Sequence, residues 1–214
     1  MLLSTAYFPP LAWIALAARD FTLSPERVLP SHAWLEAAEN YQKQSYRNRC
    51  YILAGDGPQM LQVPVIHQAD MLITKVQVDY STPWVVRTQR ALDTAYETSA
   101  WYEYYRDGLF ALLDRQPRTL WELNLSLIRW SLERIGIACE FSPTTSFAAP
   151  DAGEDDFRYQ IHPKRPNGVL EEMGLQKPYY QVFRDKMGGF TPGLSVLDLL
   201  FNEGPDSILW VVRK

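Results

Sequence analysis

The chain has 214 residues, enough for one sizeable domain or two small ones, and its 47% hydrophobic and 21% charged content is that of a folded protein. A net charge of −4 without any run of Lys or Arg argues against a dedicated nucleic-acid binder. Two cysteines, Cys50 and Cys139, predict neither a disulfide framework nor a Cys-based zinc site. No apolar run approaches the roughly 20 residues of a membrane span, and the apolar N-terminal stretch lacks a basic region before it. We therefore expect a cytoplasmic protein without an integral membrane segment.

The first 25 residues predict a βαβ-like unit: a strand at 2–5, a helix at 11–19 with Pro10 in its first turn, and a strand at 21–23. Tyr7 lies in the loop after the first strand, at the edge of the sheet where ligands tend to bind. A purely structural role, as an aromatic cover for the start of the helix, is the alternative.

The middle of the chain predicts further strands and then helices. We expect a short helix at 31–40, strands at 46–53 and 59–65 joined by the hairpin turn AGDGP, a third strand at 72–79, and a helical stretch at 84–113 that breaks near Ser99. The clearest helix runs from 119 to 135 and ends at Gly136, which suits a left-handed cap. Asn124 and Ser131 fall within its apolar stripe and are expected to form internal hydrogen bonds.

A strand candidate at 137–141 precedes a Pro-, Gly- and acid-rich stretch at 148–168, for which we expect an exposed loop. The chain shows no internal repeat. These patterns predict a single α/β domain over residues 1–214, with a mixed sheet, an N-terminal βαβ-like unit and several packed helices.

The stretch QKQSYRNRCYIL at 42–53 places polar residues within the predicted strand. Because side chains alternate along a strand, either Asn48 or Arg49 must point toward the covered face. A buried Asn or Arg is costly without a partner, so the fold supplies one or the strand lines a ligand cleft.

The C-terminal helix, expected between Thr191–Pro192 and Gly204, is apolar around most of its circumference. Ser195, Asp198 and Asn202 form a narrow polar stripe on it. The stripe predicts either a mostly buried helix with these residues facing a wet cleft or polar partners, or a solvent-facing edge.

Motifs for phosphate loops, dinucleotide binding, metalloproteases and serine hydrolases are absent, and the three histidines lack metal-ligand spacing, so we expect neither a metal nor a cofactor. What remains is a set of polar residues in apolar contexts: Lys43, Asn48, Arg49, Asn124, Tyr180, Gln181, Ser195, Asp198 and Asn202. Lys and Arg beside Asn suit an anionic ligand such as a phosphate, and Asp198 could act as a base. An internal Arg49–Asp198 ion pair is the competing interpretation.

The order of four segments resembles the WbqC-like protein family: TAYFPPLAWIA, KQSYRNRCYI with its K-x-x-x-x-N-R spacing at Lys43, Asn48 and Arg49, LQVPV, and PYYQVFRDKMGGFTPGLSVLDLLFNEGP. Ala6 stands where the family usually has glutamine, and the segment before Tyr179 is short, so the chain resembles a shortened member. The resemblance implies a cytoplasmic bacterial protein of cell-surface polysaccharide biosynthesis, such as O-antigen biosynthesis.

The resemblance also implies a transferase that adds a glycine or another acyl group to an amino-sugar attached to a nucleotide. In that hypothesis Arg49 and Lys43 hold the diphosphate, Asp198 accepts a proton from the amine, and Tyr7, Asn48, Tyr180, Gln181, Ser195 and Asn202 complete the substrate site. The alternative hypothesis is a non-catalytic protein that binds or scaffolds a protein partner of an envelope-biosynthesis pathway.

Overall fold

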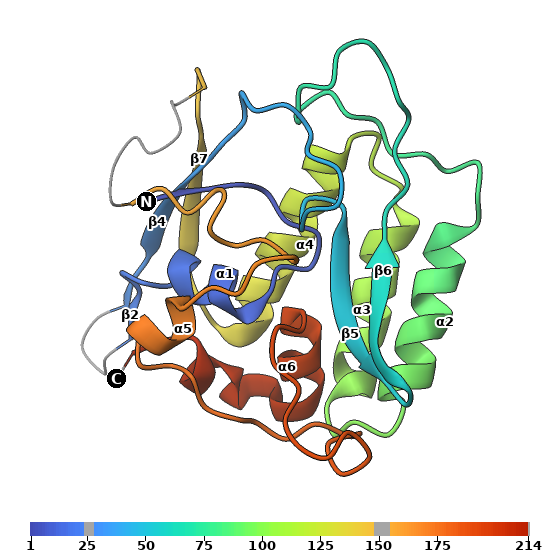
Figure 1. Ribbon diagram of the computed structural model, residues 1–214, viewed down its shortest axis with the longest axis vertical. Coiled ribbons are helices and arrows are strands. Elements are labelled where there is room, and N and C mark those ends of the chain that lie inside the picture. The colour runs from blue at the N-terminus through green and yellow to red at the C-terminus, as the bar shows by residue number, and fades with distance from the viewer. Residues whose placement is uncertain (24–27, 148–154, 214) are drawn as a thin grey trace.

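A computed structural model describes residues 1–23, 28–147 and 155–213 (Figure 1). Its elements in chain order are β1 (Leu2–Leu3), α1 (Leu11–Ala17), β2 (Thr22–Leu23), β3 (Val28–Leu29), β4 (Ser31–Leu35), β5 (Arg49–Ala54), β6 (Gly57–Gln62), α2 (Trp84–Tyr96), α3 (Tyr102–Asp114), α4 (Leu120–Ile135), β7 (Cys139–Pro143), α5 (Val169–Glu172), α6 (Val196–Glu203) and the 3₁₀ helix η1 (Gly204–Trp210). The expected class, a single α/β domain with helices packed around its strands, is confirmed.

The main sheet is parallel, with strand order β1–β4–β7. It extends beyond β1 through a single parallel bridge between Leu2 and Asp156. The unit β1–α1–β4 is thus the N-terminal βαβ, because two parallel neighbours need a crossover such as α1 between them. The expected second strand at 21–23 was wrongly assigned to this unit: it is β2, which pairs with β3 in a separate small hairpin.

The helix expected at 31–40 is wrong, because this segment begins with the central strand β4. Ser31, Ala33 and Leu35 are buried while His32 and Trp34 are exposed, the alternation of a strand with one covered face. The Ala- and Glu-rich continuation favours a helix locally, but pairing with β1 and β7 on both sides overrides that preference.

The hairpin predicted from AGDGP is confirmed as β5 and β6, paired from Arg49–Gln62 to Ala54–Gly57. The third strand expected at 72–79 is wrong. Lys75 N–H donates to the carbonyl of Leu72 in a turn, so the segment makes only isolated bridges to Asn40, Val65 and Thr119.

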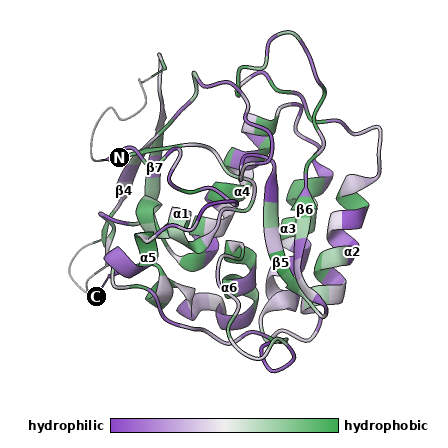
Figure 2. Ribbon diagram, viewed as in Figure 1, coloured by the Kyte–Doolittle hydropathy of each residue, from purple (hydrophilic) through white to green (hydrophobic). Residues whose placement is uncertain are grey.

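The helices pack on and between these strands, and α4 runs through the centre of the molecule (Figure 1). Thr119 and Glu122 form a reciprocal capping box at the start of α4, and Gly136 ends it with a φ of 85°, as predicted. The predicted helical stretch at 84–113 is α2 and α3, with the break at Ser99. In Figure 2 hydrophobic and hydrophilic stretches alternate along α2, as expected of a helix with one buried face.

The loop expected at 148–168 lies partly outside the described residues, which resume at 155. From there Asp155 and Phe157 form backbone hydrogen bonds with Leu2, and Arg158 and Ile161 are buried, so this part of the segment is not uniformly exposed. Among the described residues, no helix is long and apolar enough to cross a membrane.

Candidate functional site

A cavity of about 800 Å³ opens between α1, β5, α5 and the segments around residues 162–167, 175–179 and 190–194. This volume lies within the range of small-molecule binding sites. Four aromatic rings belong to its lining, those of Tyr46, Tyr51, Tyr179 and Phe190. Such rings suit a sugar or a planar base.

The lining also contains several basic side chains. His162, Lys164 and Arg165 belong to one turn, closed by the Arg165 N–H that donates to the carbonyl of His162 over 3.1 Å, and Lys177 lies on the adjoining segment. Glu171 is the carboxylate within this part of the lining. The cationic side chains outnumber it, so the wall favours an anionic ligand.

His162 is neutral at neutral pH in this environment. Burial lowers its pKa below the ordinary value of 6.5, and the nearby positive charges of Arg165, Arg47, Lys164 and Arg49 lower it further. Because the Lys164 N–H donates to its Nδ1 over 3.2 Å, the neutral ring carries its proton on Nε2. His162 therefore presents a hydrogen-bond donor without a charge.

The polar residues of the predicted strand at 46–53 divide between two environments. Asn48 is buried and donates from Nδ2 to the carbonyl of Val63 over 2.9 Å, so the fold supplies a partner for its amide nitrogen, while its Oδ1 has none among the described residues. Arg49 shares a face of β5 with Tyr51, which lines the cavity. Within the part of the chain that the structure describes, the buried Nε of Arg49 has no hydrogen-bond partner. Arg49 lies close enough to His162 to lower its pKa, although it is not itself among the residues that line the cavity.

Asp198 is buried on α6. Among the described residues, the groups that donate hydrogen bonds to its carboxylate are all neutral. The hydroxyls of Tyr96 and Tyr179 donate over 2.8 and 2.7 Å, and Nε2 of Gln181 donates over 2.9 Å. Burial raises the pKa of Asp198 above 3.8 despite these hydrogen bonds, and it raises the pKa of both tyrosines well above 10.0. Tyr179 also lines the cavity, so it joins Asp198 to that space.

The expected Arg49–Asp198 ion pair is wrong: no salt bridge joins them within the described residues, and Asp198 is occupied by the two tyrosines and Gln181. Gln181 also pairs through its amide with the backbone of Thr191. The cluster thereby connects β5, α2, α6 and the 179–191 segment, since the Leu53 N–H donates to the Tyr96 hydroxyl.

The remaining predicted residues of the C-terminal helix are buried, which excludes the solvent-facing edge. The helix begins at Val196, later than expected, because Ser195 caps it by accepting from the Leu197 N–H. Asn202 donates to the carbonyl of Asp198 over 2.7 Å. The Ser195 N–H donates to the carbonyl of Tyr51, which fixes α6 to the cavity strand.

None of the nine residues predicted for the site belongs to the cavity lining, although Tyr179 joins Asp198 to it. Tyr7 is fully buried against Phe8 and Trp84, while Lys43 and Tyr180 are exposed. Asn124 and Ser131 make the predicted internal hydrogen bonds, from Asn124 to Thr5 and the Arg47 carbonyl, and from Ser131 to the Leu127 carbonyl.

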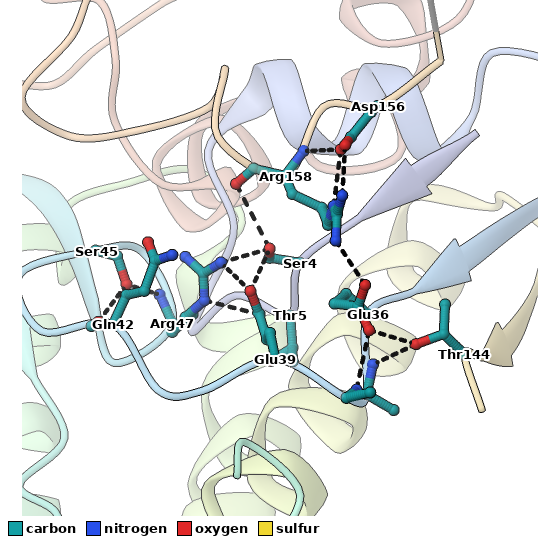
Figure 3. Close-up of polar contacts among 12 residues, drawn as sticks. Ser4, Thr5, Glu36, Glu39, Gln42, Ser45, Arg47, Thr144, Asp156 and Arg158 are labelled. Carbon is teal, nitrogen blue, oxygen red and sulfur yellow. Dashed lines mark hydrogen bonds and ion pairs between the residues drawn. The ribbon is translucent and has the colours of Figure 1, made fainter. Parts of the chain in front are cut away.

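Sequence reasoning missed the cationic turn and a buried ionic network. The run HPKR at 162–165 is a locally dense cationic signal that was assigned to the loop as a whole. In the network, Arg47 binds Glu39, and Arg158 binds Glu36 and Asp156 (Figure 3). Arg158 follows Asp156 by two positions and Arg47 follows Glu39 by eight, but Arg158 and Glu36 are 122 positions apart, so no local pattern could have revealed the whole network. Within residues 1–23, 28–147 and 155–213, no group of three or more His, Cys, Asp or Glu residues is placed to hold a metal ion.

Comparison of the sequence with known proteins shows the family to which the chain belongs. The chain is 26% identical to "Uncharacterized protein Rv1507c" from Mycobacterium tuberculosis (strain ATCC 25618 / H37Rv), over 192 residues that cover 78% of this chain and 81% of that protein. No solved structure matches significantly. The family model described as "WbqC-like protein family" matches residues 31–164, from β4 into the cationic turn, and leaves out Asp198, Tyr179 and Gln181. Because the match covers more than half of the sequence, the chain belongs to the WbqC-like protein family.

Proposed function

We propose that the protein transfers an acyl or aminoacyl group, such as glycine, to the amine of an amino-sugar carried by a nucleotide. Membership in the WbqC-like family suggests a role in polysaccharide-related biosynthesis. The observation that carries the proposal is the cavity of about 800 Å³, in which a cationic wall and aromatic rings lie together with Tyr179, the donor to Asp198.

The cationic wall would hold the diphosphate of the nucleotide. Arg165 and Lys164 supply charge, and the neutral His162 supplies a donor at Nε2. Arg49 would approach from β5, where its Nε has no partner among the described residues. Guanidinium groups bind phosphate oxygens through paired, charge-assisted hydrogen bonds, so the two arginines would contribute most of the anion affinity.

The transfer step would use the Tyr179–Asp198 pair. The amine nitrogen attacks the carbonyl carbon of an activated acyl donor, such as a thioester, and the bond to the leaving thiolate breaks as the amide forms. The amine loses a proton to the Tyr179 oxygen while the Tyr179 hydroxyl proton passes to Asp198, 2.7 Å away, and the thiolate takes up a proton from water. The raised pKa of Asp198 makes it a better proton acceptor than an ordinary aspartate. Binding both substrates side by side would supply much of the rate.

A thermal-shift panel tests the proposal: nucleotide-linked sugars with and without a free amine, acyl thioesters, amino acids and simple phosphates. A ligand at 100 times its dissociation constant stabilises the folded protein by about 2.7 kcal/mol, or a few degrees. We expect a shift with nucleotide-linked amino-sugars that is lost in Arg49→Ala and Arg165→Ala. Arg115→Ala is the matched control, because Arg115 is exposed at the end of α3 and does not line the cavity.

Amide formation is then followed by mass spectrometry with the amino-sugar and thioester that shift the melting temperature. Product that forms with wild type and disappears in the Arg165→Ala protein supports the transferase. A flat panel together with a stable protein partner in a pull-down would reject it in favour of the scaffold hypothesis.

A further inference from the structure

A buried ionic network links Arg47, two positions before Arg49, to Arg158, four positions before the 162–165 turn (Figure 3). Arg47 donates from Nε to Glu39 over 2.8 Å, and Arg158 donates from Nη1 to Glu36 over 2.6 Å. Ser4 stands where the two halves meet. Its hydroxyl accepts from Arg47 Nη2 over 2.6 Å and lies 3.3 Å from Glu39 Oε2 and 3.5 Å from the Arg158 carbonyl, two alternative acceptors for its single proton.

One half of the network anchors the cationic turn. Arg158 binds Asp156 through Nε and Nη2 over 2.9 and 2.6 Å, a paired geometry that fixes its orientation. The neighbouring backbone continues the main sheet through hydrogen bonds between Phe157, Asp155 and Leu2. His162 follows only four positions after Arg158 along the chain. The position of the turn therefore depends on how Arg158 is held.

The other half anchors the strand that carries Arg49. Arg47 is buried, and its carbonyl accepts from Nδ2 of Asn124 on α4 over 2.8 Å. Arg49 follows two positions later at the start of β5. Outside the buried network, a second contact from Lys164 to the side chain of Gln44 joins the 162–165 turn to the segment just before Arg47.

We infer that Ser4, Arg47 and Arg158 are positioning residues that fix the spacing between Arg49 and the 162–165 turn, and that this spacing selects two linked phosphate groups over a single one. Two cationic groups held at a constant separation, Arg49 and the 162–165 turn, suit a diphosphate, since each phosphate meets one of them, whereas a monophosphate engages one at a time. The inference deepens the proposed function, on which it rests for the presence of a diphosphate in the cavity.

The test compares inorganic pyrophosphate with inorganic phosphate by NMR titration of the histidine ring signals. The chain has only three histidines, so a His162→Gln protein assigns the relevant signal. We expect wild type to bind pyrophosphate at least about tenfold more tightly than phosphate, because both cationic groups are engaged at once. In Ser4→Ala, which leaves the ion pairs in place, we expect that preference to fall several-fold while the phosphate affinity changes little.

The matched control is Ser131→Ala, the same substitution at a buried serine that bonds only within its own helix among the contacts of the described residues. It should keep the wild-type preference. A second variant, Arg158→Lys, keeps the positive charge beside Glu36 but loses the paired bond to Asp156, and it should behave as Ser4→Ala does. If Ser4→Ala does not fold, the pyrophosphate preference of Arg158→Lys tests the inference in its place.

The pH titration of His162 provides a readout that needs no ligand. If Ser4, Arg47 and Arg158 hold the turn near the charges of Arg47 and Arg49, then loosening this network moves those charges away from His162. The pKa of His162 should then rise toward 6.5 in Ser4→Ala but not in Ser131→Ala. If Ser4→Ala and Arg158→Lys both keep the wild-type preference for pyrophosphate over phosphate and the wild-type pKa of His162, the inference is overturned. Nucleotide-sugar binding in the thermal-shift panel judges the proposed function separately, so the two can fail independently.

Discussion

Two buried clusters in this molecule hold carboxylates in opposite ways. Glu39 and Glu36 are each bound by a guanidinium, from Arg47 and Arg158, whereas Asp198 is bound by neutral hydroxyl and amide groups. Burial without a cationic partner raises the pKa of Asp198, so this carboxylate binds a proton more readily than an ordinary aspartate. The proposals accordingly give a positioning role to the first cluster and proton transfer to the second.

The largest effect is expected from Arg47→Ala. Removing the guanidinium leaves the Glu39 charge buried without its partner, which costs about 3–5 kcal/mol of unfolding free energy. Urea denaturation measures this loss. The control is Arg106→Ala, which breaks the partly exposed ion pair with Asp93 and should cost about 0–1 kcal/mol. Equal losses in the two variants would contradict the expectation that the buried pair matters more than the exposed one.

The next effect is expected from Asp198→Asn. The new amide places N–H donors where the hydroxyls of Tyr96 or Tyr179 also donate, so one buried group loses its partner at a cost of about 1–3 kcal/mol. Transferase activity should fall much further than the folded fraction, which chemical denaturation and a single-turnover assay measure on the same sample. Activity that simply follows the folded fraction would make Asp198 a structural residue like Glu39.

A smaller effect comes from removing one hydroxyl at a time. Tyr96→Phe and Tyr179→Phe each delete one hydrogen bond to Asp198, and each should cost about 1 kcal/mol of stability in thermal unfolding. Only Tyr179 lines the cavity, so kcat should fall more in Tyr179→Phe than in Tyr96→Phe. Equal kcat values in the two variants would remove Tyr179 from the proton transfer.

The smallest effect is a difference in pH dependence between Asp198 and Asp156. The folded-state pKa of Asp198 is raised, so above 3.8 the folded chain holds the proton more tightly than the unfolded chain, and the contribution of Asp198 to stability decreases as pH rises through that window. The Arg158 guanidinium lowers the pKa of Asp156, so its contribution is present above 3.8 and is lost as pH falls through the folded value.

Unfolding free energies of wild type, Asp198→Asn and Asp156→Asn between about pH 3 and pH 8 check both signs. The wild-type advantage over Asp198→Asn should shrink with rising pH, and the advantage over Asp156→Asn should grow. Slopes of the same sign would contradict the contrast between the two clusters.

Local patterns predicted those parts of the fold that local interactions determine. The capping box and Gly136 delimit α4, and the turn AGDGP forms the β5–β6 hairpin. The strand β4 escaped prediction because its neighbours β1 and β7, and not its own residues, stabilise the extended conformation.

The site divides in the same way. The polar stripe on α6 left two interpretations open, and the structure shows buried residues with polar partners. The partners of Asp198 come from α2 and from the 179–181 segment, which no spacing in the sequence connects. The ionic network joins Arg158 to Glu36 across 122 positions, and such pairs become visible only when the chain is folded.

The parallel pairing of β4 with β7 has a consequence for the order of folding. The hydroxyl of Ser31 contacts the carbonyl of Ala138, 107 positions further along the chain, whereas the β5–β6 hairpin closes through a short turn. Closing so long a loop carries a large entropic cost, and non-local pairing slows folding. We expect the hairpin to form within microseconds and the main sheet to assemble last. During synthesis β4 therefore cannot complete its pairing until β7 has left the ribosome.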